Sequence, residues 1–70
     1  MNATYKKVGE RIRSLRKDKE LTQEDLAALT RIEARSIVDI EAGKRNPTLK
    51  TLQKIARALQ ISIEELFKKS

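Results

Sequence analysis

The sequence predicts an all-α fold, a compact domain of five helices, and three observations lead to this. Apolar residues recur at three- and four-residue steps from Tyr5 to Phe67. No segment alternates apolar and polar residues as a half-buried strand does. With only two glycines and one proline, the helices are delimited mainly by capping residues. We expect residues 1–70 to form a single domain.

Apolar stripes and one cap predict the first two helices. The first stripe consists of Tyr5, Val8, Ile12 and Leu15. It predicts a helix from about Thr4 to Lys19. Thr22 can cap a second helix, because Asp25 stands three residues later and Leu26 and Leu29 continue the apolar face.

Three further helices follow in the same way. The third has the apolar positions Ile32, Ile37 and Ile40. Gly43 is placed to end it in the left-handed conformation. Thr48 can cap a fourth helix, whose stripe is Leu49, Leu52, Ile55, Ala56 and Leu59. Ser62 with Glu65 has the spacing of a capping box for a short fifth helix, which carries Ile63, Leu66 and Phe67.

Charge favours a polyanionic partner. The formal charge is +6 and the isoelectric point is about 10.0. Residues 1–20 carry seven bases and three acids, residues 21–43 two bases and five acids, and residues 44–70 seven bases and two acids. Two basic flanks therefore surround an acidic middle. A basic solvated surface is the alternative reading of the charge alone.

Composition argues against several other classes of protein. The chain has no cysteine and no histidine, so we expect no disulfide and no metal site. We expect no cofactor and, because 70 residues leave no room for a ligand-sensing module, no small-molecule ligand. An enzyme is a poor reading, since no nucleophile–base pair or phosphate-binding glycine loop is present. Met1 to Glu10 hold no apolar run typical of a signal peptide, and no stretch approaches the roughly 20 apolar residues of a membrane span. A basic helix on a membrane surface is also poor, because the apolar stripes belong to five short helices. We expect a cytoplasmic protein.

Four blocks in register carry a resemblance to a known family. They are Gly9–Arg13, Leu21–Ala27, Ile40–Pro47 and Ile61–Phe67. With them the chain resembles the phage-repressor-like, or xenobiotic-response-element, helix-turn-helix family, which includes phage repressors, restriction-modification controllers and many small bacterial regulators. The resemblance implies a lambda-repressor-like fold with a helix-turn-helix at about residues 22–42, and sequence-specific binding of double-stranded DNA by a transcriptional regulator.

The resemblance also implies roles for residues of the second and third helices. Gln23 would bond a DNA phosphate, and a recognition helix at about residues 33–42 would enter the major groove. Its outward residues would be Ala34, Arg35, Ser36 and Asp39. Arg35 is the first candidate to read guanine, with a phosphate contact as the alternative. Ser36 would reach a base or a phosphate, and Ala34 would offer its methyl group to thymine.

Beyond the recognition helix, the resemblance implies phosphate contacts and one structural ion pair. The phosphate contacts would come from Lys44, Arg45, Asn46 and Thr48. A solvated charged loop is the alternative. Arg16 and Glu41 occupy positions that form a salt bridge in the family, joining the first helix to the end of the third.

Three residues depart from the family pattern. Arg31 stands where glycine is usual, in a turn that commonly requires a positive φ, so the turn is either strained or built differently. Glu33 replaces the usual serine or threonine cap of the recognition helix. Asp39 is acidic where a neutral or basic residue is common, and it can accept from cytosine or pair with Arg35.

Two hypotheses about assembly and function stay open. The first is a homodimer on a palindromic operator with half-sites about one helical turn apart. Its dimer face would be Ile63, Leu66 and Phe67, although these residues can equally close the core. The second is a protein-interaction module of the same fold, similar to an antitoxin or a coactivator, and the acidic middle of the chain motivates it.

Overall fold

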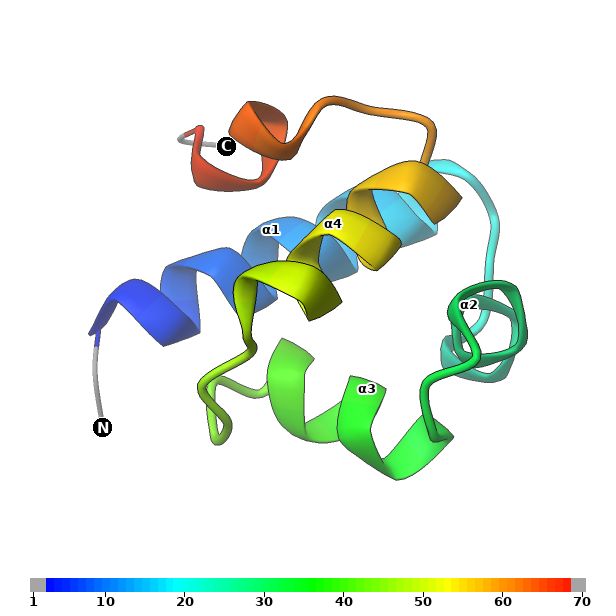
Figure 1. The fold of residues 1–70 in the computed structure, drawn as a ribbon, viewed down its shortest axis with the longest axis horizontal. Coiled ribbons are helices and arrows are strands. Elements are labelled where there is room, and N and C mark those ends of the chain that lie inside the picture. The colour runs from blue at the N-terminus through cyan, green and yellow to red at the C-terminus, as the bar shows by residue number, and fades with distance from the viewer. Residues whose placement is uncertain (1–2, 69–70) are drawn as a thin grey trace.

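The computed structural model describes residues 3–68, and every regular element in that range is helical (Figure 1). The elements are α1 (Ala3–Asp18), α2 (Gln23–Thr30), α3 (Ala34–Glu41), α4 (Leu49–Ala58) and the 3₁₀ helix η1 (Ile63–Phe67). Helix α3 packs against α1 and α2, α2 also packs against α4, and η1 lies on α1 and α4. Residues 1–2 and 69–70 of the expected domain lie outside the described residues. None of the helices in residues 3–68 is both long and apolar enough to cross a bilayer.

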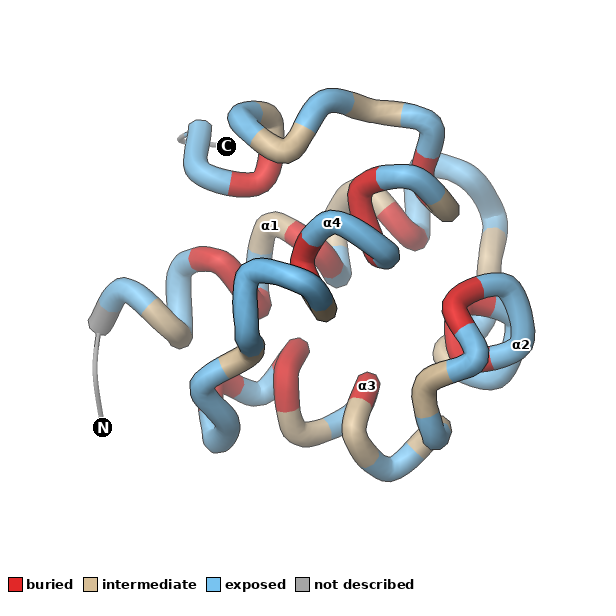
Figure 2. The backbone as a smooth tube through the Cα atoms, in the orientation of Figure 1, coloured by how far each residue is buried: buried red, intermediate tan, exposed pale blue. Residues whose placement is uncertain are grey.

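One apolar core draws side chains from all five elements. Its members are Val8, Ile12, Leu26, Ala27, Ile37, Ile40, Leu52, Ile55, Ala56, Leu59 and Leu66. The buried segments of the helices face one another around the centre of the fold (Figure 2). Burying one Leu or Ile side chain stabilises a fold by about 1.5–3 kcal/mol. The predicted stripes are therefore the faces that hold the helices together.

The prediction of five α-helices is wrong at the last element. Residues 63–67 form a 3₁₀ helix, and the Ser62 side chain makes no capping hydrogen bond. The Glu65 carboxylate, expected to bond back to Ser62, instead contacts Arg11 of α1 and Lys68. Arg11 also donates to the Glu65 carbonyl at 2.9 Å. Contacts with α1 therefore replace the predicted capping box.

Caps determine where α2 and α4 begin, as predicted. The Thr22 hydroxyl accepts from the Asp25 N–H at 2.9 Å, and the Asp25 carboxylate accepts from the Thr22 N–H at 2.9 Å. The Thr48 hydroxyl accepts from the Thr51 N–H at 3.1 Å. A cap of this kind contributes about 1 kcal/mol. Glu33, which precedes α3, provides no side-chain cap.

Every α-helix ends in a left-handed residue, and three of the four are not glycine. Glu20, Arg31 and Gln60 have φ of 58°, 59° and 60°, and Gly43 has 73°. The backbone N–H of the residue that follows Glu20, Arg31 or Gln60 donates to a carbonyl in the last turn of the helix. The Ile32 N–H, for example, donates to the Ala27 carbonyl at 3.2 Å. Of the two alternatives for Arg31, the turn with a positive φ is thus the one observed, whereas the left-handed residues Glu20 and Gln60 were not predicted.

Both glycines lie where α1 meets α3 and the segment that follows it. A Cβ on Gly9 would lie 2.7 Å from the Glu41 carbonyl oxygen, and a Cβ on Gly43 would lie 2.8 Å from the Lys6 Cα. These distances are too short for non-bonded atoms. Glycine at the two positions therefore lets α1 and α3 approach closely.

Arg31→Gly should raise the free energy of unfolding by about 0.5–1 kcal/mol. The left-handed conformation costs a residue with a side chain roughly 1–2 kcal/mol, and glycine removes this cost. The greater conformational freedom of glycine in the unfolded chain offsets part of the stabilisation. Urea denaturation followed by circular dichroism measures the change. Gly43→Ala is the opposite control and should destabilise the fold. An Arg31→Gly variant no more stable than the parent would show that the turn is unstrained.

Candidate nucleic-acid interface

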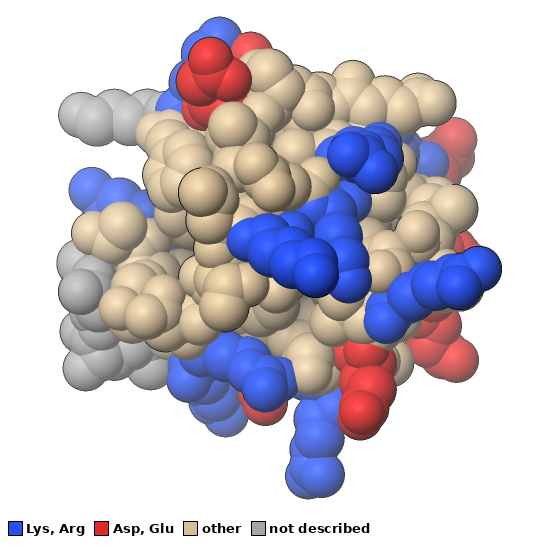
Figure 3. Space-filling model, viewed as in Figure 1, with Lys and Arg blue, Asp and Glu red and all other residues tan. Residues whose placement is uncertain are grey.

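The residues expected to contact DNA lie on the start of α2, on α3 and in the loop that follows α3. In the view of Figure 1 the loop and α3 form the lower edge of the molecule and α2 lies at the right. Lys and Arg side chains lie on the face of the molecule that is toward the viewer, where α4 is, and along this lower edge. An acidic patch lies at the lower right (Figure 3). The edge therefore carries both signs of charge.

A buried ion pair joins α1 to the end of α3. Arg16 donates from Nε to Glu41 Oε2 at 2.7 Å and from Nη2 to Glu41 Oε1 at 3.0 Å. The side chains are only 8% and 3% exposed. The hydrogen bonds to Glu41 raise the pKa of Arg16 above its usual value. Arg16 Nη1 also donates to the Leu21 carbonyl at 2.6 Å, which ties the chain just before α2 to the same pair.

Gln23 at the start of α2 belongs to this network. Its Nε2 donates to Glu41 Oε1 at 3.1 Å. The backbone around it is fixed by the reciprocal bonds between Thr22 and Asp25, and the pKa of the Asp25 carboxyl is lowered because it accepts from the Thr22 N–H. The partly buried Gln23 side chain is therefore held beside the end of α3, with a second amide hydrogen left to donate.

The outward side of α3 is less uniform than the sequence suggested. Arg35 is exposed, whereas Ser36 and Asp39 are half-buried and Ala34 packs partly against the core. Within residues 3–68, no ion pair joins Arg35 to Asp39. Arg35 is thus the predicted reader most accessible to a ligand.

The loop after α3 folds back toward the start of that helix. Arg45 Nη1 donates to the Ser36 hydroxyl, so the exposed Arg45 guanidinium lies beside the first turn of α3. Lys44, Asn46 and Thr48 are exposed, and the Thr48 hydroxyl is used as the cap of α4. Gln23 and Arg45 therefore contact opposite ends of α3, one near its last residues and one near its first turn.

Two further residues lie near this interface and were not predicted as site residues from the sequence. Arg13 and Val38 line a depression of about 500 Å³ together with Gln23, Glu41 and Ala42. Val38 is 43% exposed. Arg13 belongs to the basic faces of α1. Val38 lies in α3 outside the apolar stripe of Ile37 and Ile40, and this position is the signal that the sequence offered.

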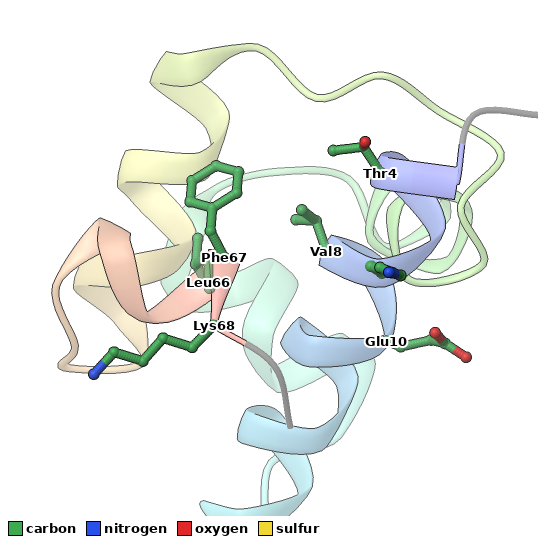
Figure 4. A pocket seen from close by; sticks show the side chains of 7 residues that line it. Thr4, Val8, Glu10, Leu66, Phe67 and Lys68 are labelled. Atoms are coloured by element: carbon green, nitrogen blue, oxygen red, sulfur yellow. The ribbon is translucent and has the colours of Figure 1, made fainter.

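The three residues expected at a dimer face have different environments. Leu66 is 1% exposed and closes the core, Ile63 is half-buried, and Phe67 is 56% exposed. Phe67 and Leu66 stand across a crevice of about 490 Å³ from Thr4 and Val8 of α1 (Figure 4). Of the three, Phe67 offers the most apolar surface to a second molecule.

The sequence and the fold are both similar to those of known helix-turn-helix proteins. The helix-turn-helix family HTH_3 matches residues 12–66. The chain is 40% identical over 68 residues to the control protein C.MunI of Mycoplasma sp, covering 96% of this chain and 92% of that protein. It is 39% identical over 59 residues to the immunity repressor protein of Bacillus phage phi105, covering 84% of this chain but 41% of the repressor.

A solved structure is similar over nearly the whole fold. The restriction-modification controller protein C.AhdI from Aeromonas hydrophila is 41% identical and superposes with a TM-score of 0.92. The match covers 94% of this chain and all of that one.

Glu41→Gln should lower the free energy of unfolding by about 3–5 kcal/mol, because the variant leaves the buried Arg16 charge without its partner. Urea denaturation measures the loss. The double variant Arg16→Met with Glu41→Leu removes both charges and should recover part of the stability, whereas Glu10→Gln, an exposed acid on α1, should change little. A cost below about 1 kcal/mol for Glu41→Gln would mean that the pair does not constrain the fold.

Proposed function

The chain belongs to the helix-turn-helix family HTH_3, whose members regulate transcription by binding DNA, and we propose that it reads a specific double-stranded sequence with α3 in the major groove. The observation that supports this most is the outward side of α3, which carries the exposed Arg35 next to Ser36, the residue that Arg45 contacts, while Gln23 contacts the other end of the helix. A reading element needs such anchors, since phosphate contacts position a protein and base contacts specify the sequence.

The proposed phosphate contacts lie at both ends of α3. Gln23 has a free amide hydrogen at the start of α2, where the helix dipole also favours an anion. Lys44, Arg45 and Asn46 are exposed in the loop, with Thr48 at the start of α4. Cationic contacts of this kind release counterions from DNA, so affinity should fall steeply with salt.

The proposed base contacts are few. Arg35 can bond guanine O6 and N7 together, and Asp39 can accept from cytosine N4. Ser36, which already accepts from Arg45, would orient that guanidinium or reach a base itself. Ala34 is half-buried, so its methyl group is the least accessible of the four. Specificity then depends chiefly on Arg35. As DNA is the proposed ligand, we place the protein in the cytoplasm.

We further propose that the protein binds a palindromic operator as a homodimer. A single 70-residue chain offers few phosphate contacts, and two copies on half-sites about one turn apart double them. Phe67 and the crevice beside Val8 form the surface proposed for this contact.

Selection of bound DNA from a random pool should return one preferred sequence, and Arg35→Ala should lose the preference at one or two positions of each half-site. A bidentate contact to guanine is worth about 1–3 kcal/mol of discrimination. Arg57→Ala, which removes an exposed charge from α4, is the matched control and should select the same sequence. Unchanged preferences in Arg35→Ala would refute its role, and no selective binding even at low salt would favour the protein-interaction module.

Sedimentation at micromolar concentration should give a dimer, and Phe67→Ser should shift it to a monomer, because the exchange removes the exposed aromatic surface of the contact. Leu29→Ser is a matched control, since Leu29 is 59% exposed but does not line the crevice. A parent protein that sediments as a monomer, both alone and with operator DNA, would overturn the dimer.

A further inference from the structure

Val38 is an exposed apolar residue on the outward side of α3. It is 43% exposed, whereas Ile37 and Ile40 of the same helix are 0% and 3% exposed. A β-branched residue has a lower helix propensity than most residues, so an exposed valine brings α3 no local stability. Its side chain is therefore available to a molecule that binds the outward side of α3.

The neighbours of Val38 belong to the interface. At 3.6 residues per turn, Arg35 and Ala42 are its neighbours along the helix surface, three residues before and four after. Val38 also lines the depression that holds Gln23 and Ala42. It thus lies between Arg35, the proposed base reader, and Gln23, the proposed phosphate anchor.

We propose that Val38 is a specificity-determining residue that recognises thymine by packing against its C5-methyl group. This inference rests on the proposed function, because it requires α3 in the major groove. Valine has no side-chain donor or acceptor, so the only base feature of the major groove that suits it is the thymine methyl. Cytosine at the same place would present its amino group to an apolar surface, with no partner for it.

Replacing thymines by uracil, one at a time, in the selected operator tests the contact, because the exchange removes the methyl and leaves every hydrogen-bonding group unchanged. At one position of each half-site, uracil should weaken binding of the parent protein by about three- to fivefold, the value of one buried methyl group. Val38→Ser, which puts a polar group in place of the apolar side chain, should bind the thymine and uracil operators equally well. Fluorescence anisotropy at fixed salt measures both affinities.

Leu29→Ser is the matched control, because it makes the same kind of exchange at an exposed apolar residue of α2 and should keep the full difference between thymine and uracil. Equal affinity of the parent protein for every uracil operator would overturn the inference while DNA binding itself stands. A difference that persists in Val38→Ser would overturn it as well. Failure to bind any operator would instead overturn the proposed function, and the inference with it.

Discussion

The Arg16–Glu41 ion pair is the contact on which the geometry of the interface depends. One guanidinium bonds the last residue of α3 and the carbonyl that precedes α2, and the same carboxylate accepts from Gln23. Three elements are thereby fixed to one another by charged, directional bonds inside a small core. Apolar side chains alone tolerate rotation of a short helix, since dispersion contacts are not directional. The ion pair thus restricts the orientation of α3, whereas burial of its apolar side chains in the core stabilises the helix against the rest of the fold.

The two glycines serve the same purpose by steric means. Gly9 and Gly43 leave room for α1 against the end of α3 and the segment after it, where any Cβ would collide with backbone atoms. Close approach brings Arg16 within bonding distance of Glu41, and burial then makes that bond obligatory, because an unpaired charge there is costly. Glycine, arginine and glutamate at these positions therefore act as one unit.

Local signals explain most of what the sequence predicted. The caps of α2 and α4 involve residues three positions apart, and the core stripes follow from helical spacing, so both could be inferred from the chain. Contacts between distant residues could not. Arg11, 54 residues away, takes the Glu65 side chain from its expected cap, and the bonds of Gln23 to Glu41 and of Arg45 to Ser36 span 18 and 9 residues. The exposure of Val38 could not be predicted from the sequence, because it depends on which side of α3 the other helices cover.

The hydrogen bond between Gln23 and Glu41 has a consequence for the lifetime of a complex. A free glutamine loses about 0.5–1.5 kcal/mol of rotamer entropy when a ligand immobilises it. Here folding has already restricted the side chain, so little of that loss is left for the encounter with DNA. Differences of this kind act mostly on the rate of dissociation. In the proposed complex, a phosphate contact from the pre-ordered Gln23 would therefore slow dissociation more than it speeds association.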